Sequence, residues 1–402
     1  MESNISNESA REAQDTQAVK ESQRQKITKL LSPLRSYSKI SRAVLLMLLY
    51  GVRGFLKLCM YMYKYVWCPH PYAIANDYRA VYDGIAVKRR IEYGHLDREF
   101  MDCIVPVPHR QQNHPGFFGT VKEIVTNTGG GHIQVHAAKR NVIVFFHGGG
   151  WVIEGSDVQL QQLTSWVREG FTVYSVNYPL SPEHRFPIAI VSFLKALRTL
   201  KEKHGVESVH IVGESAGANI AALGVGILKN PKLMESFVDG TSHQFHTWDF
   251  PQLLSYSCWY GVLDRESWRK TPGKFLGYQM GEYSIFKYGL ELCFMWYESH
   301  EGILDNKVTL MEYEEYIQDY CPVQFISGGI DPIGLQASNK VAHEMLSGKG
   351  LKSEHVLMEE LTHGGVAYPP QIQKWLFGID IEKTCVLANK KIMAFIKEHS
   401  CD

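Results

Sequence analysis

A serine stands at the centre of a glycine-flanked pentapeptide, Gly-Glu-Ser-Ala-Gly at residues 213–217. The apolar run 209–212 precedes it, and the small-residue stretch 219–228 follows it. This order predicts a strand, a tight turn and a helix, and glycines at both ends of the turn let the backbone bend sharply without a Cβ clash. Ser215 would then present its hydroxyl beside a helix N-terminus, where it can act as a nucleophile. A chance occurrence in a glycine-rich loop is the alternative, which the flanking strand and helix disfavour.

A second glycine cluster is expected to supply hydrogen-bond donors for such chemistry. Residues 141–146 form an apolar run typical of a buried parallel strand, and His-Gly-Gly-Gly-Trp follows at 147–151. The backbone N–H groups of Gly148 and Gly149, with that of Ala216, are predicted to stabilise the oxyanion formed when a serine attacks a carbonyl. The alternatives are a flexible loop and a phosphate cradle, but the chain lacks the Gly-Lys-Ser/Thr of a phosphate loop.

A candidate acid and a candidate base follow in the order serine, acid, histidine. Residues 323–329 are a predicted strand that ends just before Asp331, and 355–358 are another, followed by the loop that contains His363. Active-site loops gather at the carboxyl ends of parallel strands. His363 is therefore predicted to accept the Ser215 proton while Asp331 orients the imidazole. The rival acids are Glu359 and Glu360. They lie too close to His363 in the sequence to approach it from a neighbouring strand.

These motifs resemble those of the hormone-sensitive-lipase group of α/β-hydrolases from about residue 142 to the C-terminus. The resemblance rests on both glycine motifs, on Asp331-Pro332, on His363-Gly364 and on residues 177–187. The last segment, Asn-Tyr-Pro-Leu-Ser-Pro-Glu-His-Arg-Phe-Pro, looks like the group's Tyr-Arg-Leu-Ala-Pro-Glu-His-Pro-Phe-Pro block and implies a structural role. Two departures are Glu214, where the group commonly has Asp, and Pro-Ile-Gly-Leu-Gln after Asp331, where it usually has Arg-Asp-Glu.

The resemblance implies a serine hydrolase that cleaves carboxylic esters of lipophilic molecules by ping-pong acyl transfer, without a cofactor or metal. Acylglycerols and short-chain acyl esters are the implied substrates, and deacetylation of steryl acetates or N-acetyl groups is the alternative. A non-catalytic receptor of the gibberellin-receptor type would have lost the catalytic histidine, whereas Ser215, Asp331 and His363 all stand here. A membrane-tethered scaffold is a third class, which would not react with a fluorophosphonate probe.

Length and composition are those of a globular enzyme with appendages. The chain has 402 residues, of which 45% are hydrophobic and 21% charged. A formal net charge of zero gives no reason to expect a nucleic-acid partner. Eight cysteines are scattered without a Cys-x-x-Cys pair, so neither a zinc site nor a disulfide framework is expected.

Strand and helix patterns alternate along the chain, which predicts an α/β fold with a mostly parallel central sheet flanked by helices, the α/β-hydrolase fold. We expect this domain to cover residues 68–402 and its first hairpin to use residues 120–125 and 133–136. Helical cap elements are expected at about 68–118, which is rich in proline, and at 265–320, which is rich in aromatic residues. An aromatic lid favours an apolar substrate pocket, although most of these side chains are expected to form the core of the cap itself.

Two segments precede the predicted domain. Residues 1–31 are polar and predict a disordered tail. Residues 32–67 predict an apolar, membrane-associating amphipathic or anchoring helix. At about 100° per residue, its basic side chains share a sector of roughly 80°; these are Arg35, Lys39, Arg42, Arg53, Lys57 and Lys64. Attachment through residues 33–67 to the endoplasmic reticulum or a lipid-droplet surface is therefore expected, and a tilted spanning anchor or a helix packed on the body are the alternatives.

Deletion of residues 1–67 tests this expectation. The truncated chain should stay in the supernatant when membranes are sedimented and keep its activity, because the chemical motifs all lie downstream. Arg53→Glu combined with Lys57→Glu should release an interfacial helix, at about 1 kcal/mol per charge lost near anionic lipid, but should not release a spanning anchor. Full-length protein that itself fractionates with the supernatant would contradict membrane attachment.

Overall fold

The structure of the chain is a computed structural model that divides into two compact units, residues 1–56 and 57–402. The described residues are 51, 54, 80–82, 85–106, 141–239, 245–275, 278–280, 307–366 and 382–400. The predicted tail at 1–31, nearly all of the predicted membrane helix at 32–67 and the predicted hairpin at 120–136 lie outside them. Among the helices that are described, none combines the length and the apolarity needed to cross a membrane.

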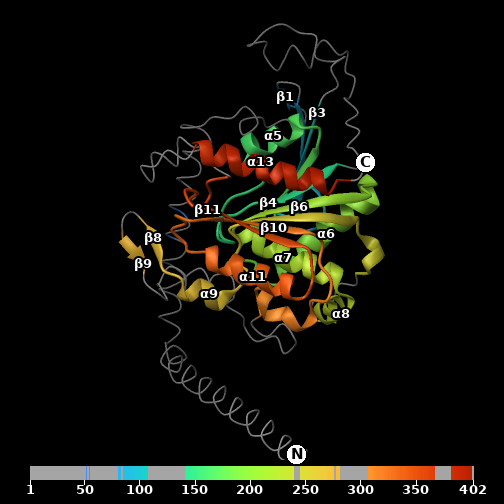
Figure 1. Ribbon diagram of the computed structural model, residues 1–402. Helices are drawn as coiled ribbons and strands as arrows, with labels where there is room; N and C mark the ends of the chain where they lie inside the picture. Colours follow the sequence, from blue (N-terminus) through green and yellow to red (C-terminus); the bar gives the residue numbers. More distant parts are fainter. Residues whose placement is uncertain are drawn as a thin grey trace, which may run out of the picture. The chain divides into compact units, whose positions relative to one another are not determined.

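A nine-stranded sheet runs through the described part of the second unit in the order β1-β2-β3-β5-β4-β6-β7-β10-β11 (Figure 1). Strands β1 to β3 and the β3–β5 pair are antiparallel, and every pair from β5 to β11 is parallel. The strands are β1 (Ala80–Tyr82), β2 (Ile85–Glu92), β3 (Phe100–Pro106), β4 (Val142–Phe146), β5 (Thr172–Val176), β6 (Ser208–Glu214), β7 (Gln252–Trp259), β10 (Val323–Gly328) and β11 (Ser353–Met358). The predicted α/β fold with a mostly parallel sheet is confirmed.

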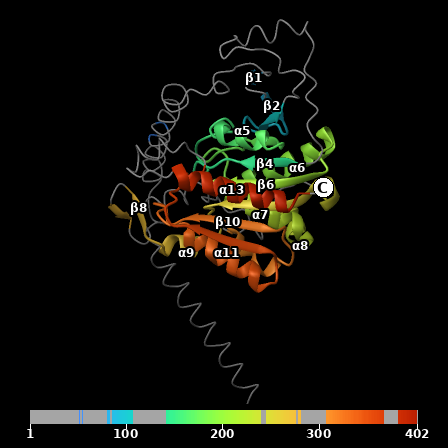
Figure 2. The same ribbon diagram turned by 45° about the horizontal axis from the view of Figure 1, so that its top comes forward.

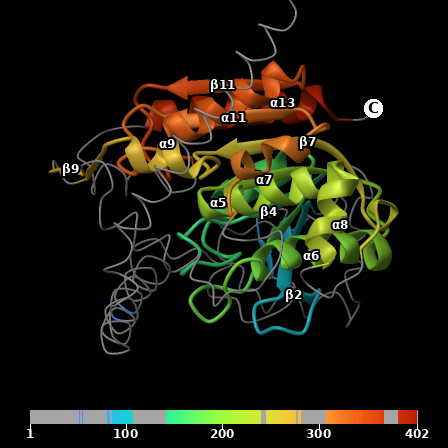
Figure 3. The ribbon, with the colours of Figure 1, turned by 90° about the horizontal axis from the view of Figure 1, so that it is seen from below.

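Helices cover both faces of this sheet. Figure 1 shows α5 (Leu160–Arg168) and α13 (Glu382–Glu398) on one face, where Trp166 Nε1 donates to Asn389 Oδ1 at 2.9 Å. Figure 2 turns this face forward, and Figure 3 shows the opposite face from below. The helices of that face are α6 (Ile188–His204), α7 (Ala216–Lys229), α8 (Pro231–Asp239) and α11 (Gln336–Gly348).

The central strands are apolar because both of their faces are covered. All residues of β4, β5, β6 and β10 are buried, as expected of parallel strands between two helical layers. In the register of β4 with β6, Phe146 lies opposite Gly213. The loops that leave these two strands therefore emerge side by side, which places the His-Gly-Gly-Gly-Trp motif next to Ser215.

The prediction that residues 68–118 belong to a cap is wrong for their described part, because β1, β2 and β3 extend the main sheet. Charged residues hid these strands from the hydrophobic pattern: β2 carries Lys88, Arg89 and Arg90 in its middle, next to an irregularity in its pairing with β3. The buried Asp102 of β3 contacts two of them: Oδ2 lies 3.4 Å from Arg89 Nε, and Oδ1 accepts from the backbone N–H of Arg90 at 2.9 Å.

The predicted cap at 265–320 is also corrected at its two ends, which pack into the main body. Its described elements are α9 (Arg265–Lys270), β8 (Gly273–Phe275), β9 (Tyr278–Met280) and the 3-10 helix η4 (Leu310–Tyr316). Trp268 of α9 is fully buried and donates to the Ile333 carbonyl at 3.2 Å. After η4, the Tyr320 hydroxyl donates to the Ala222 carbonyl of α7 at 2.9 Å. Residues 281–306 lie outside the described part.

The packing of α6 against α7 can be tested at Gly224, because a methyl group there would lie 2.3 Å from a ring carbon of the fully buried Phe193. Gly224→Ala should lower the free energy of unfolding by about 1–3 kcal/mol through overpacking, although alanine favours helix formation. Gly348→Ala, at the end of α11 with nothing within 4 Å, is the control and should leave stability unchanged or slightly raised. Equal denaturant midpoints for both variants would show that the α6–α7 contact relaxes freely.

Candidate active site

Ser215 occupies a sharp turn between β6, which ends at Glu214, and α7, which begins at Ala216. Its φ of +51° and ψ of −114° are strained for a residue with a side chain. Two contacts hold this conformation: the Ser215 N–H donates to the Trp259 carbonyl at 2.9 Å, and its carbonyl accepts from Asn219 N at 3.1 Å. Glycine is required at position 217, where a Cβ would lie 2.2 Å from the Phe146 carbonyl oxygen.

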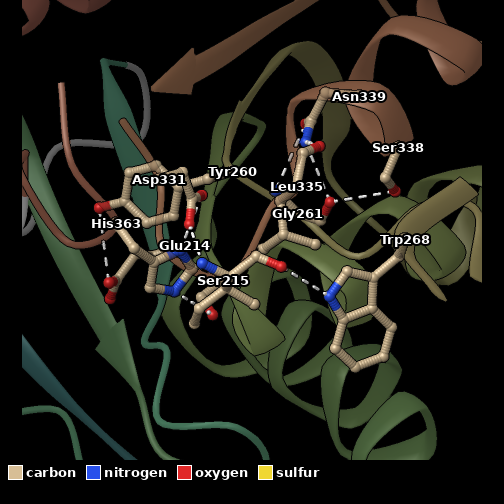
Figure 4. Close-up of polar contacts among 11 residues, drawn as sticks. Glu214, Ser215, Tyr260, Gly261, Trp268, Asp331, Leu335, Ser338, Asn339 and His363 are labelled. Atoms are coloured by element: carbon tan, nitrogen blue, oxygen red, sulfur yellow. Dashed lines mark hydrogen bonds and ion pairs between the residues drawn. The ribbon is translucent and has the colours of Figure 1, made fainter. Parts of the chain in front are cut away.

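The structure brings together the three residues predicted for proton transfer (Figure 4). His363 Nε2 lies 3.0 Å from Ser215 Oγ, and His363 Nδ1 lies 3.0 Å from Asp331 Oδ2. When the imidazole carries its proton on Nδ1 and donates it to Asp331, Nε2 is left to accept the serine proton. Ile333 N donates to the second carboxylate oxygen of Asp331 at 2.7 Å and fixes its orientation. Such a chain of hydrogen bonds can activate a hydroxyl group.

These side chains come from loops at the carboxyl ends of three parallel strands. Asp331 follows β10 and His363 follows β11, while Ser215 follows β6. Asp331 is buried and Ser215 is 8% exposed, and the His363 side chain is 16% exposed. The rival acids do not share this setting, because Glu359 and Glu360 are both exposed.

One predicted oxyanion donor is assigned wrongly, because the Gly148 N–H donates to the Glu214 side chain at 3.1 Å. The reason lies in the sheet: β4 and β6 are neighbours, so the carboxyl group at the end of β6 lies beside the first glycine after β4. Gly149 and Ala216 remain as candidates. Ala216 is the first residue of α7, and N–H groups of a first helical turn have no acceptor within the helix.

The shape of the glycine loop depends on Gly149. Its φ is +91°, and a Cβ there would lie 2.4 Å from the Ile153 carbonyl oxygen, so this position accepts only glycine. Its carbonyl accepts from Val152 N and Ile153 N, both at 3.1 Å, which closes the turn. Trp151 Nε1 then reaches Asn219 Oδ1 of α7 at 3.3 Å. The loop is therefore attached to the same helix that begins next to Ser215.

Tyr178, in the segment 177–187, contacts the glycine loop, in agreement with the structural role that the resemblance implied for this segment. The Tyr178 hydroxyl donates to the carbonyls of His147 at 2.8 Å and Gly148 at 3.0 Å, and its ring stacks on the His147 imidazole. Arg98, which the sequence patterns did not single out, donates to the carbonyls of Tyr178 at 3.1 Å and Glu154 at 2.6 Å.

The segment after β7 is fixed to α11, the helix that follows Asp331. Ser338 Oγ accepts from Leu263 N and Asp264 N, both at 2.8 Å. Asn339 binds both backbone groups of Gly261, with Nδ2 donating to its carbonyl at 3.0 Å and Oδ1 accepting from its N–H at 3.3 Å (Figure 4). A second amide acts from α7: Asn219 Nδ2 donates to the carbonyls of Val262 and Val308, both at 2.9 Å.

A buried polar group that the sequence patterns noted only as a departure is Glu214. Its carboxyl accepts from Gly148, from Gln159 Nε2 at 2.6 Å and from the Tyr260 hydroxyl at 3.5 Å. Burial, and then the negative charge of Glu154, raise the pKa of Glu214 well above its ordinary value, against the lowering effect of these hydrogen bonds. The signal in the sequence was the longer acid in place of Asp.

Within the described residues, no three His, Cys, Asp or Glu side chains are grouped so that they could hold a metal ion. The described cysteines are free thiols: Cys103, Cys258, Cys321 and Cys385.

Comparison with known proteins places residues 143–367, more than half of the chain, in a family model described as alpha/beta hydrolase fold. An 81-residue segment is 38% identical to versiconal hemiacetal acetate esterase stcI of Emericella nidulans, and covers 19% of this chain and 28% of that protein. A 94-residue segment is 34% identical to hormone-sensitive lipase of Ictidomys tridecemlineatus, and covers 22% of this chain and 12% of the lipase. The chain thus matches less than a third of the length of either relative.

The solved structure of esterase B from Lactobacillus Rhamnosis (HN001) has a similar fold. It superposes with a TM-score of 0.59 over 89% of this chain and 100% of its own, at 15% sequence identity. At this level of identity the likeness concerns the fold alone.

Labelling with a fluorophosphonate, which reacts with activated serine hydroxyls, tests the arrangement of Ser215, His363 and Asp331. The wild-type chain should be labelled at Ser215, and Ser215→Ala should not be labelled at all. Asp331→Asn should be labelled far more slowly, since the same change lowers turnover about 10⁴-fold in the best-characterised Ser-His-Asp triad, that of another protein. Mass spectrometry of the labelled peptide and the rate of labelling are the measurements.

Two matched variants serve as controls, Ser347→Ala on α11 and Glu359→Gln after β11, both at exposed positions. They should be labelled at the wild-type rate. Labelling that persists in Ser215→Ala would place the reactive serine elsewhere. Normal labelling of Asp331→Asn together with slow labelling of Glu359→Gln would move the acid.

Proposed function

The chain belongs to the alpha/beta hydrolase fold family, and on that basis we propose that it is a serine hydrolase that cleaves carboxylic esters. One observation carries the proposal: Ser215, His363 and Asp331 form a continuous chain of hydrogen bonds, with two links of 3.0 Å, at a strained turn beside a helix N-terminus. In this arrangement a hydroxyl group can be deprotonated at the moment that it attacks an electrophile.

In the first half of the proposed reaction, His363 Nε2 takes the Ser215 proton while Oγ attacks the ester carbonyl. The carbonyl oxygen becomes an oxyanion, which accepts hydrogen bonds from the N–H groups of Ala216 and Gly149. Loss of a single donor of this kind costs about 10²–10³ in turnover in another serine hydrolase. Asp331 stabilises the imidazolium, which then protonates the leaving alcohol as the C–O bond breaks.

In the second half, a water molecule replaces the alcohol. His363 takes a proton from the water, the resulting hydroxide attacks the acyl group on Ser215, and the same N–H groups stabilise the second oxyanion. Collapse of this intermediate releases the carboxylic acid and returns the proton to Ser215 Oγ. The two products leave in separate steps, so the kinetics should be ping-pong.

The names of the two curated relatives, an acetate esterase and a lipase, support esters of lipophilic alcohols with short to medium acyl groups, including acylglycerols. Deacetylation of steryl acetates or of N-acetyl groups would use the same steps, with an amine as the leaving group in the second case. The contact between His363 and Ser215 disfavours a non-catalytic receptor of the gibberellin-receptor type, because such a receptor lacks the catalytic histidine.

We further propose that residues 33–67 bring the enzyme to a membrane or lipid-droplet surface, where lipophilic esters accumulate. This proposal rests on the apolar composition and the basic stripe of that segment in the sequence.

Purified full-length protein should be assayed against p-nitrophenyl esters of graded acyl length, acylglycerols and an acetylated sterol, with Ser215→Ala as the blank. We expect hydrolysis of the short to medium esters, none by the blank, and a burst of p-nitrophenol when deacylation limits turnover. A folded wild-type protein that hydrolyses no ester or acetamide would refute the proposed function. A rate on the acetylated sterol above that on every p-nitrophenyl ester would assign the deacetylase alternative.

A further inference from the structure

Glu214 is a buried acid that the proposed reaction does not use, although it lies directly before the nucleophile. It is the last residue of β6 and only 2% exposed. Burial of a carboxyl group lowers the stability of the fold unless the group is hydrogen-bonded. The hydrogen bonds of Glu214 therefore indicate what this residue does.

The contacts of this carboxyl group join three segments that surround Ser215. Oε2 accepts from the Gly148 N–H in the loop after β4 and from Gln159 Nε2 at the start of α5, at 3.1 and 2.6 Å. Oε1 accepts a hydrogen bond from the hydroxyl of Tyr260, the residue after β7, at 3.5 Å (Figure 4). One side chain therefore bridges the loops that leave β4 and β7.

Two of these contacts, those with Gly148 and Tyr260, lead to a proposed reacting group. Gly148 is bonded to Gly149, whose N–H is a candidate oxyanion donor. The ring of Tyr260 packs against the imidazole of His363, with the two centroids 4.7 Å apart. A displacement of Glu214 would therefore shift both an oxyanion donor and the general base.

The surroundings of Glu214 favour its protonated form. In the described part of the chain its hydrogen-bond partners are a peptide, an amide and a phenol, none of which is cationic. Gln159 Nε2 also lies 3.3 Å from Glu154 Oε2, so a second carboxyl group approaches through the same donor. Two neighbouring acids do not both ionise readily, and Glu214 is the one that is almost fully buried.

The other titratable groups that face Glu214 are the phenols of Tyr178 and Tyr260, from the loops after β5 and β7. Burial raises the pKa of each well above its ordinary value, so both stay neutral. A carboxylate at position 214 would add a negative charge close to the place where the oxyanion forms and would oppose it. A neutral carboxyl group avoids that repulsion: Oε2 still accepts from Gly148 and Gln159, and a proton on Oε1 can be donated to the Tyr260 hydroxyl oxygen.

We propose that Glu214 is a positioning residue, an uncharged carboxyl group that holds the glycine loop and His363 in place around Ser215. This inference rests on the proposed ester hydrolysis, and it adds a pH limit to that reaction: turnover should fall on the alkaline side when Glu214 ionises.

Thermal unfolding of wild type and Glu214→Gln at several pH values tests the charge state without any assay of activity. The raised pKa means that the folded chain keeps the Glu214 proton at pH values where the unfolded chain, with a glutamate pKa of about 4.3, has released it. The stability due to this group is complete below that value and is lost as the pH rises toward the folded-state pKa. The Tm of Glu214→Gln minus that of wild type should therefore grow as the pH rises above about 4.3. A constant or shrinking difference would overturn the uncharged carboxyl.

Kinetics on the best p-nitrophenyl ester test the positioning role. Glu214→Gln keeps the shape and the neutral charge, so its kcat should stay within about threefold of wild type at neutral pH and should lack the alkaline fall. Glu214→Ala leaves the Gly148 N–H without its acceptor, and kcat should drop by about 10²–10³, as for a lost oxyanion donor, with KM nearly unchanged. Glu359→Gln, an exposed acid, should match wild type throughout.

An alkaline fall in Glu214→Gln like that of wild type, or a kcat in Glu214→Ala near that of wild type, would overturn the inference. If Glu214→Ala fails to fold, the pH profile of Glu214→Gln still tests whether ionisation of Glu214 causes the alkaline fall in turnover. An inactive wild-type protein would instead refute the proposed hydrolysis itself, and the unfolding measurements would report the charge of Glu214 separately.

Discussion

The hydrogen-bonded group of Ser215, His363 and Asp331 depends on one strained residue. Ser215 has a positive φ, a conformation that costs about 1–3 kcal/mol and persists only where the surrounding structure enforces it. The enforcement comes from three sides: the Trp259 carbonyl of β7 accepts the serine N–H, α7 begins directly after it, and Gly217 lies against the Phe146 carbonyl of β4. The parallel pairing of β4, β6 and β7 brings these groups together, so the register of the sheet decides whether the hydroxyl is presented.

Around this turn, polar side chains donate hydrogen bonds to backbone carbonyls that apolar side chains would leave unpaired. Tyr178, Arg98 and Asn219 bind backbone carbonyls of loops, which have no partner strand of their own. Unpaired buried carbonyls are costly, so each such contact selects a single loop conformation. The site thus consists of irregular backbone held by side chains from neighbouring loops and from α7, and Ser215 Oγ lies 3.0 Å from His363 Nε2 within it.

Sequence patterns were sufficient for the parallel half of the fold and for the three residues that the structure joins by hydrogen bonds, Ser215, His363 and Asp331. Ser215, Asp331 and His363 were identified because each follows an apolar run, and the carboxyl ends of parallel strands meet at one edge. The antiparallel strands β2 and β3 were missed, since the charge of Arg89 is balanced by residues distant in sequence, Asp102 of β3 and Asp157. The error at Gly148 has a similar origin: a glycine can be located from the sequence, but the direction of its N–H depends on the Glu214 side chain from another strand.

The amide of Asn219 has a consequence for how such enzymes diversify. It donates to Val262 and to Val308, which flank the long insertion between β7 and η4, and it stands only four residues after Ser215. Both ends of the insertion are thus fastened to α7 independently of what lies between them. Since doubling the length of a loop closed at fixed ends costs only about 0.6 kcal/mol, the intervening segment can be lengthened, shortened or replaced during evolution at little thermodynamic cost. Such changes leave the two carbonyls that Asn219 holds, and with them the start of α7 next to Ser215, in place.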